Sequence, residues 1–234
     1  MPVVPDPLDL VRLGPRGDGG YVLSKSAIAH TTDLFSPGVG PTWGFEEDLV
    51  TMSQCNVRMI DGSISRPPQL PEEFAFDEYW LRKKCLPNSI RLEDWILREG
   101  LQESLSLGLQ MDVEGSEWEV LRDIRADTLR QFRFMVIEFH GMDQVEFLWN
   151  YAWTIRPVMR KLLREFGVIH AHANNCCRYI LMDDVLVPSI LEISFVRRDL
   201  MLGMEGSVDW AEHLDYPNDP MKPELSLRSW QANK

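Results

Sequence analysis

The sequence predicts an α/β protein whose mostly parallel sheet is covered by helices on both faces. Short apolar runs alternate along the chain with segments in which apolar residues recur at helical spacing. The apolar runs are nearly continuous, as expected for parallel strands that are buried on both faces. The 234 residues contain no internal repeat and no low-complexity segment, so we expect one domain that spans residues 1–234.

The elements of the first half begin with a Gly-rich loop at residues 12–23. In order, we predict strands at 21–23 and 33–36, a helix at 43–52 and a strand at 57–60. Thr42 is the expected N-cap of this helix, and Glu46 lies in its first turn, where the helix dipole favours an acidic side chain. Residues 64–88 contain prolines and aromatic residues without a clear period, and we assign no element there.

The second half repeats the alternation of helices and strands. In order, we predict a helix at 92–103, a strand at 105–111, a helix at 117–122, a strand at 134–137, a long helix at 144–165, and strands at 167–172, 178–182 and 190–197. Ser116 is the expected cap of the helix at 117–122, which has Glu117 and Glu119 in its first turn. The tail after about residue 203 contains three prolines and is expected to be irregular.

Composition and charge exclude several classes of protein. The chain carries 24 Lys and Arg against 36 Asp and Glu, which gives a formal net charge of −12. Nucleic acids and anionic membranes are bound by clustered Lys and Arg, so this balance argues against both partners. No apolar run reaches the roughly 18 residues of a membrane-spanning helix, and the N-terminus lacks the basic and apolar stretches of a signal peptide.

The four cysteines indicate a reducing compartment. They are Cys55, Cys85, Cys176 and Cys177, and their spacing does not resemble that of a zinc site. Reduced thiols in a cytoplasmic protein are the simplest interpretation. The adjacent Cys176 and Cys177 can also be interpreted as a redox pair.

Glycine, carboxylate, imidazole and amide groups follow the predicted strands. The residues are Gly38, Gly40, Asp61, Asp112, Glu114, Glu138, His140, His172 and Asn174. The carboxyl ends of parallel strands meet at one edge of a sheet, and the ligands of open α/β sheets bind outside that edge. The sequence therefore predicts a ligand site where these residues converge.

A cofactor site is predicted at the first two of these strand ends. Gly38 and Gly40 lie between a strand and a helix, where the absence of side chains lets a ligand approach the backbone. Asp61 follows the next strand, beside Gly62 and Ser63, and can accept both ribose hydroxyls of an adenosine cofactor.

The third glycine of this region, Gly44, comes one position too late for the pattern Gly-x-Gly-x-x-Gly that binds a pyrophosphate. S-adenosylmethionine therefore fits better than a dinucleotide. Its positive sulfonium also suits a pocket lined by carboxylates. An NAD-binding oxidoreductase of similar topology is the alternative.

The segment from Leu109 to Leu121, LQMDVEGSEWEVL, resembles the signature segment of the FkbM-type S-adenosylmethionine-dependent methyltransferases. Residues 18–22, 136–141 and 170–175 support this resemblance. It implies a class I methyltransferase (Rossmann-like) fold, with a seven-stranded sheet whose last strand is antiparallel. It also implies O-methylation of a hydroxyl on a sugar, a polysaccharide precursor, or a glycosylated or polyketide-type metabolite. A non-catalytic module that binds S-adenosylmethionine is a second alternative.

The chemistry of methyl transfer assigns roles to the residues at the later strand ends. The acceptor must be aligned with the sulfonium and must lose its hydroxyl proton. His140 is the first candidate for the base, because an unshifted imidazole titrates near neutrality. His172 is the second candidate, unless it is a core histidine. Asp112 can orient the base or the substrate.

Further polar residues are assigned to the substrate and the cofactor. The candidates for substrate binding are Glu114, Glu138, Asn174 and Asn175, and the two glutamates can also hold the amino group of the cofactor. Asp18 and Tyr21 lie on the Gly-rich loop and are expected to close over the cofactor pocket.

Structural interpretations of the same acids stay open. Glu117 is interpreted as an acid that only stabilises a helix N-terminus. Glu114 can cap that helix instead of binding a substrate. Glu138 can pair with an arginine, either Arg133 or Arg178.

A metal ion and a phosphate are further possibilities. Asp112 with Glu138 or His140 can bind a divalent ion that acidifies a hydroxyl, although no local spacing demands a metal. The segment 74–84 combines aromatic residues with the basic residues 82–84. It can be a lid that stacks on a sugar and meets a phosphate, or the solvated basic end of a helix.

Overall fold

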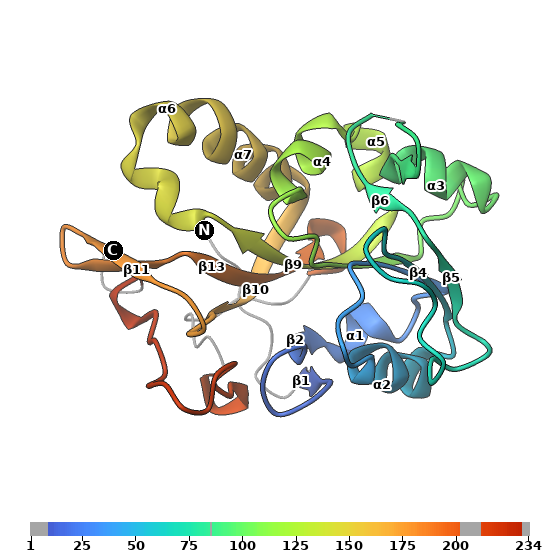
Figure 1. Cartoon of the computed structure of the whole chain (residues 1–234), viewed down its shortest axis with the longest axis horizontal. Helices are drawn as coiled ribbons and strands as arrows, with labels where there is room; N and C mark the ends of the chain where they lie inside the picture. The colour runs from blue at the N-terminus through green and yellow to red at the C-terminus, as the bar shows by residue number, and fades with distance from the viewer. Residues whose placement is uncertain (1–8, 85, 202–211, 231–234) are drawn as a thin grey trace.

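A seven-stranded sheet forms the centre of the molecule, in the order β10-β13-β9-β8-β3-β4-β5 (Figure 1). The computed structural model describes residues 9–84, 86–201 and 212–230. The strands are β3 (Asp33–Pro37), β4 (Asn56–Ile60), β5 (Ala75–Asp77), β8 (Leu107–Met111), β9 (Phe132–His140), β10 (Phe166–Ala173) and β13 (Ile190–Arg197). Neighbours from β5 to β9 pair in parallel, whereas β13 is antiparallel to both β9 and β10. The predicted fold class, with an antiparallel last strand, is confirmed.

Helices cover both faces of this sheet (Figure 1). One face carries α3 (Leu92–Arg98), α4 (Glu117–Asp123), α5 (Ala126–Leu129) and α7 (Arg156–Glu165). The other face carries α1 (Lys25–Ile28), α2 (Gly44–Ser53) and a hairpin of β1 (Leu10–Leu13) and β2 (Tyr21–Ser24). The sheet is therefore the middle layer of three.

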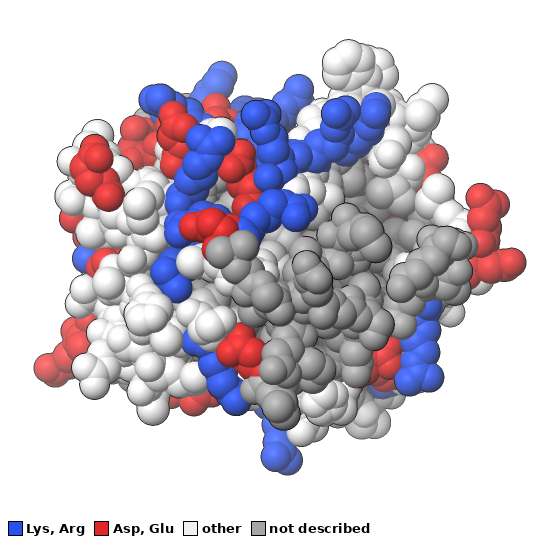
Figure 2. Space-filling model, turned by 180° about the vertical axis from the view of Figure 1, so that it is seen from behind, with Lys and Arg blue, Asp and Glu red and all other residues white. Residues whose placement is uncertain are grey.

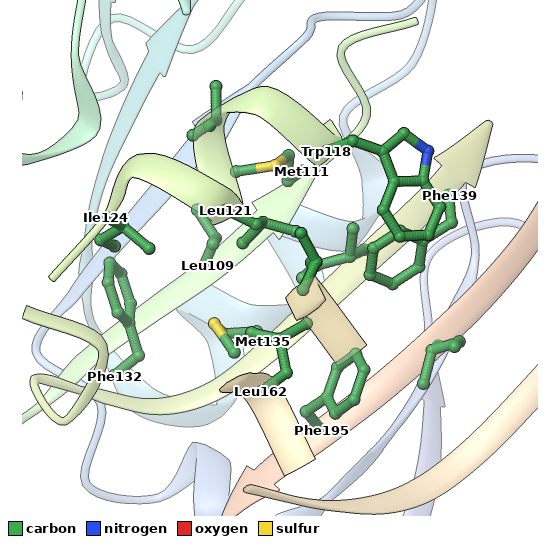
Figure 3. Close-up of a cluster of buried hydrophobic side chains, with 14 of the residues drawn as sticks. Leu109, Met111, Trp118, Leu121, Ile124, Phe132, Met135, Phe139, Leu162 and Phe195 are labelled. Atoms are coloured by element: carbon green, nitrogen blue, oxygen red, sulfur yellow. The ribbon is translucent and has the colours of Figure 1, made fainter. Parts of the chain in front are cut away.

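Strand β9 shows why its apolar run is continuous. Met135 and Phe139 belong to the core under α4 and α7, where the Phe139 ring lies 4.7 Å from the ring of Trp118 (Figure 3). Phe134 and Val136 belong to the core on the opposite face. Each buried side chain of this kind contributes about 1.5–3 kcal/mol relative to an exposed one, so both faces of the strand favour apolar residues.

The predicted long helix at 144–165 is wrong in its first half. The chain forms the 3₁₀-helix η1 (Met142–Glu146), the short turn α6 (Leu148–Asn150) and the π-helical turn η2 (Tyr151–Ile155) before α7 begins. Pro157 lies in the first turn of α7. Because proline has no N–H to donate to the preceding turn, the backbone there is free to widen into a π turn.

Two predicted helix boundaries are also corrected. Thr42 is not the N-cap of α2, because Trp43 occupies that position and makes no side-chain capping bond. The helix predicted at 92–103 ends at Arg98. Gly100, with φ of +72°, then turns the chain, a conformation that glycine adopts without steric cost.

Short strand pairs outside the main sheet account for the remaining differences. The strand predicted at 178–182 is β11 (Tyr179–Met182). Among the described residues it pairs with β12 (Val185–Pro188) alone, in a hairpin inserted between β10 and β13. Residues 64–88 contain the edge strand β5 and also β6 (Trp80–Leu81), which pairs with β7 (Ser89–Ile90). The strands β5, β6 and β7 are only two or three residues long, which is too short for an alternation of apolar and polar residues to be recognised in the sequence.

The C-terminal segment 212–230 packs against β10. Its bridge joins Leu225 to Ala173, and its two 3₁₀ turns are η4 (Glu212–Leu214) and η5 (Arg228–Trp230). Leu227 is buried in the same hydrophobic core as residues of α7 and β10. The predictions for residues 1–8, for Cys85 and for the first part of the tail lie outside the described residues.

The charge of the molecule is unevenly distributed. Figure 2 shows the rear face, where Lys and Arg side chains gather over the upper, helical layer despite the negative net charge. Helix α7 alone carries Arg156, Arg160, Lys161 and Arg164. Of the helices in the described ranges, none is long and apolar enough to cross a bilayer.

Candidate active site

The site lies where the strand order reverses, between β3 and β8. From β3 the chain continues to β4 and β5 on one side, and from β8 it continues to β9 on the other. Gly38, directly after β3, has φ of +87°, and a Cβ placed on it would lie 1.5 Å from the carbonyl oxygen of Asp112, directly after β8. Only glycine permits this approach. The crevice at such a reversal is the usual ligand site of an open α/β sheet.

The first cavity, of about 220 Å³, opens at the carboxyl ends of β3, β4 and β8. Its walls include Asp61, Gly62, Ser63, Tyr79, Trp80 and Arg82. The carboxylate of Asp61 accepts hydrogen bonds from the N–H of Val39 (2.9 Å) and the N–H of Ser63 (2.7 Å). These bonds hold the loops after β3 and β4 together. The structure thus places Asp61, Gly62 and Ser63 in one cavity.

The second cavity, of about 170 Å³, lies on the other side of Gly38. Its walls include Asp18, Gly19, Tyr21, Gly40, Thr42 and Glu46, and both Gly38 and Asp112 line the first cavity as well. A Cβ on Gly40 would meet no atom within 4 Å. Space beside this glycine is therefore open to a ligand.

Two residues of the second cavity differ from the sequence predictions. Tyr21 lies in β2, as the strand predicted at 21–23 implies, and its ring is buried with its centre 5.4 Å from the centre of the Phe45 ring. It is therefore a fixed wall of the cavity and not a loop residue that closes over it. Glu46 is more than a helix N-terminal acid. It is buried, it accepts a hydrogen bond from Ser36 Oγ at 2.6 Å, and burial raises the pKa of its carboxyl group. In the sequence, the only indication that Glu46 is buried was its position next to the apolar Phe45.

A larger cleft, of about 740 Å³, lies on the side of β9 and α4. Its walls include Glu114, Trp118, His140, Gln144, Asn150 and Thr154. Arg82, Glu114 and Ser116 line both this cleft and the first cavity. The three spaces are therefore contiguous around the ends of β8 and β9.

Three of the predicted residues, Asp112, Glu114 and Glu138, meet around the imidazole ring of a fourth, His140. Its Nε2 lies 3.2 Å from Glu114 Oε2, 3.7 Å from Glu138 Oε1 and 4.0 Å from Asp112 Oδ1. Ligand atoms of Asp112, Glu114 and His140 lie within 4.8 Å of one another, so these three could hold a metal ion. Glu138 pairs with neither Arg133 nor Arg178, since Arg178 pairs with Asp143 and Arg133 donates to backbone carbonyls.

Glu117 is the residue of this cluster that the sequence interpretation missed. It is fully buried, and its Oε1 accepts from the N–H of Val113 (3.1 Å) and of Gly115 (3.0 Å) and lies 3.2 Å from His140 Nδ1. Ser116 occupies the predicted N-cap position of α4, and the alternative cap by Glu114 is not present among the described hydrogen bonds. The Ser116 side chain makes no capping bond. The Glu117 side chain instead folds back over the loop before α4 and accepts from the N–H groups of Val113 and Gly115.

The burial of these groups alters their pKa values. Burial raises the pKa of Asp112 to about 7, although the nearby imidazole opposes the shift. Burial and the neighbouring carboxylates also raise the pKa of Glu138. For His140, burial lowers the pKa, but the bond to Glu117 and the surrounding carboxylates outweigh it and raise the pKa above its ordinary value of 6.5. Among the described residues, Asp112 Oδ1 is buried without a hydrogen-bond partner. The cluster is thus suited to a cationic ligand.

His172 occupies a different environment from His140. Its Nδ1 lies 3.1 Å from Glu192 Oε2 and its Nε2 lies 2.8 Å from Glu224 Oε1. Although burial lowers the pKa of His172, these two bonds raise it to about 10. The ring is therefore an imidazolium at neutral pH, and it lines neither the two cavities nor the cleft.

The two predicted asparagines are divided between the site and the C-terminal segment. Asn174 Nδ2 lies 3.4 Å from both Glu138 Oε1 and Glu192 Oε1. Asn175 Nδ2 donates to the carbonyls of residues 219, 222 and 223. Asn175 therefore anchors the C-terminal segment, whose position the local sequence did not indicate.

Comparison with known proteins adds two findings. The sequence profile described as the methyltransferase FkbM domain matches residues 38–168, more than half of the chain. No curated protein matches the chain.

Among solved structures, the chain matches a mutant of the 16S rRNA (adenine(1408)-N(1))-methyltransferase from Catenulisporales acidiphilia. The sequence identity is 10%, and the match covers 80% of this chain and 98% of that chain. The TM-score of 0.33 is too low to bear on function.

Proposed function

Because the chain belongs to the FkbM methyltransferase domain family, we propose that it is an S-adenosylmethionine-dependent O-methyltransferase. The proposed acceptor is a hydroxyl of a sugar, a polysaccharide precursor, or a glycosylated or polyketide-type metabolite. Family membership supports methyl transfer over hydride transfer with NAD. The choice of oxygen and of this acceptor class is our proposal.

The contact between Asp112 and His140 is the observation that carries the proposal. Asp112 lines both small cavities, and His140 lines the large cleft. His140 Nε2 lies 4.0 Å from Asp112 Oδ1. A cofactor in the small cavities and an acceptor in the cleft would thus meet at these two residues, as an in-line displacement requires.

The residues of the two small cavities fit S-adenosylmethionine. Asp61 would accept the ribose hydroxyls beside Gly62 and Ser63, and the open space at Gly40 would admit the amino-acid part beside Asp18 and Tyr21. Asp112 Oδ1, buried and without a hydrogen-bond partner among the described residues, matches a positive charge. When bound, this cofactor supplies an electrophilic methyl group on a sulfonium.

His140 is the proposed base for the acceptor hydroxyl. Glu117 Oε1 holds Nδ1, which leaves Nε2 directed at the carboxylates beside the cleft. The neutral ring is needed for proton removal, and the surrounding carboxylates oppose that form by raising the pKa of His140. A positive charge bound near Asp112 would offset these carboxylates and favour the neutral imidazole.

The test uses purified protein, S-adenosylmethionine labelled in the methyl group, and a panel of hydroxyl-bearing sugars and glycosylated metabolites. We expect label in an acceptor, one S-adenosylhomocysteine per transfer, and survival of the label through mild alkali, which hydrolyses methyl esters but not ethers. His30→Ala is the matched control, because His30 is exposed near the start of β3, at the opposite edge of the sheet. It should retain turnover that His140→Ala loses.

The remaining alternatives predict different outcomes of the same assay. A non-catalytic module would bind S-adenosylhomocysteine but transfer no label to any hydroxyl acceptor. A metal held by Asp112, Glu114 and His140 would make turnover depend on divalent ions. Dialysis against a chelator, followed by the assay with and without Mg²⁺, separates that mechanism from base catalysis by His140 alone.

A further inference from the structure

Three basic side chains line one wall of the large cleft. They are Arg82 and Lys83, which follow β6, and Arg122 on α4. The alternative that residues 82–84 end a helix is wrong, because a strand precedes them and no helix does. These cations therefore face a cavity in a molecule whose acids outnumber its bases by 36 to 24.

The two arginines of this wall are available to a ligand. Within the described ranges, neither Arg82 nor Arg122 has a carboxylate in ion-pair distance, whereas Lys83 Nζ lies 3.3 Å from Glu119 Oε2. Arg82 lies 5.4 Å from the centre of the Trp80 ring, which supports its guanidinium without neutralising it. Other arginines, such as Arg91 and Arg130, are paired with acids.

The opposite wall of the cleft has a different chemistry. It is formed by the irregular helical segment before α7 and contributes Gln144, Asn150 and Thr154, which are neutral hydrogen-bonding residues. Thr154 lies in the π-helical turn, a distortion that often accompanies functional sites. The cleft also contains two carboxylates, Glu114 beside His140 and Glu119 paired with Lys83. The unpaired cations at one side and the neutral polar groups at the other match a ligand with one anionic part and one part rich in hydroxyls.

We propose that the acceptor is a sugar that carries a phosphate, either as a sugar phosphate or as a nucleotide-linked sugar. This inference rests on the proposed function and narrows its substrate class. Arg82 and Arg122 bind the phosphate oxygens, for which the planar guanidinium is suited, and Lys83 exchanges Glu119 for the phosphate. The sugar then lies between the neutral wall and His140, with one hydroxyl directed at Nε2.

The experiment measures binding by calorimetry to the full chain saturated with S-adenosylhomocysteine. The probes are glucose, glucose 1-phosphate and UDP-glucose. We expect both phosphorylated probes to bind at least about tenfold more tightly than glucose, since each charged hydrogen bond adds a factor of this order. Preference for glucose 1-phosphate or for UDP-glucose identifies which source of phosphate the cleft accepts.

Matched variants locate the binding site. Arg122→Gln should weaken glucose 1-phosphate binding by roughly tenfold and leave the affinity for S-adenosylhomocysteine unchanged, because Arg122 lines only the cleft. Arg125→Gln is the control, since Arg125 lies three residues away, is exposed and does not line the cleft. It should change neither affinity.

Two results would overturn the inference. One is that the phosphorylated probes bind no better than glucose to a chain that binds S-adenosylhomocysteine, and this result leaves the proposed methyl transfer intact. The other is that Arg125→Gln weakens phosphate binding as much as Arg122→Gln, which would indicate attraction to the surface in general. A chain that bound the phosphorylated probes but not S-adenosylhomocysteine would keep the anion site and refute the proposed function.

Discussion

His140 and His172 lie at the same edge of the sheet, and neighbouring carboxylates raise the pKa of both, but their surroundings differ. The side chain of His140 is 16% exposed and borders the cleft, with Nε2 facing three acids. The side chain of His172 is 5% exposed, and both ring nitrogens are bonded, to Glu192 and to Glu224. Carboxylates beside a histidine therefore do not identify a base. The two histidines differ in which space they border and in how their ring nitrogens are held. His140 borders the large cleft beside the proposed cofactor cavities, with Nε2 near the exposed Glu114. His172 lines a separate cavity of about 170 Å³, and both of its ring nitrogens are hydrogen-bonded.

The largest effect is expected for His140→Ala. If His140 removes the hydroxyl proton, turnover should fall by about 10²–10⁴-fold, the usual contribution of general base catalysis. The affinity for S-adenosylhomocysteine should stay the same, because His140 does not line the two small cavities. Steady-state kinetics and calorimetry on the same preparation measure both quantities. If His140→Ala kept the turnover of the wild type, His140 would not be the base, and no functional difference between the two histidines would remain.

His172→Ala should instead reduce stability. Removing the imidazolium leaves Glu192 buried without its cation, and breaking a buried pair of this kind costs about 3 kcal/mol. The loss is limited because Asn218 Nδ2 still donates to Glu192 Oε1 at 2.6 Å. Urea unfolding of the wild-type and variant chains measures the difference in free energy. A variant as stable as the wild type would show that the pair has no structural role.

The stability that His172 provides should also depend on pH. Its pKa is about 10 in the folded protein against an ordinary value of 6.5. A group whose folded pKa is raised stabilises the protein fully below the unfolded pKa, and this stabilisation disappears as the pH rises through the folded pKa. The difference in unfolding free energy between wild type and His172→Gln should therefore shrink between pH 6.5 and pH 10. Because Asp112 and Glu138 titrate in both the wild type and His172→Gln, their contribution to the pH dependence cancels in this difference.

Asp61→Ala tests the cofactor side of the site. Loss of a carboxylate that accepts ribose hydroxyls should weaken S-adenosylhomocysteine binding by roughly 10- to 100-fold. Asp61→Asn is the companion variant, since its amide oxygen can still accept the N–H of Val39 and preserve the loop. If calorimetry gave full affinity for Asp61→Ala, the cofactor would not lie in the first cavity.

The same comparison explains how much of the site the sequence could predict. Gly38, Asp61 and Asp112 each directly follow a buried parallel strand, and His140 is the last residue of β9. The strand pattern alone therefore brought these four residues to one edge. His172 also lies at a strand end, but its partner Glu224 comes from the C-terminal segment, which shows no period. Only long-range packing places that segment beside β10, and local sequence patterns carry no information about it.

Glu117 illustrates a second limit of the sequence. An acid at the start of a helix is common, and the helix dipole explains it without any site. What distinguishes Glu117 is full burial and a bond to His140, and both depend on the contact between α4 and β9. The helix α4 is fixed there by Trp118 Nε1, which donates to the carbonyl of His140 at 2.7 Å. The position of the His140 side chain thus depends on Trp118 and Glu117, which lie 22 and 23 positions earlier in the chain.

Glu117→Gln should produce the smallest effect, a displacement of the pH profile. The carboxylate of Glu117 raises the pKa of His140 through its bond and its charge, and the base must be neutral to act. Removing that charge should move the acidic limb of kcat/KM to lower pH, by roughly one unit, a shift typical of a single neighbouring charge. In His172→Gln, the acidic limb of kcat/KM should stay at the wild-type pH, because His172 lies outside the cleft.

In Glu117→Gln, the amide oxygen can still accept hydrogen bonds from the N–H groups of Val113 and Gly115, so the loop should keep its conformation. A displacement of the acidic limb of kcat/KM then measures the effect of the lost charge alone. A limb that stays in place in Glu117→Gln, with kcat reduced, would mean that Glu117 only supports the loop. In that case the base would be a group other than the imidazole of His140. A limb that moves in both variants would mean that the two histidines are electrostatically coupled through Glu138 and Glu192, and the separation of the two regions would fail.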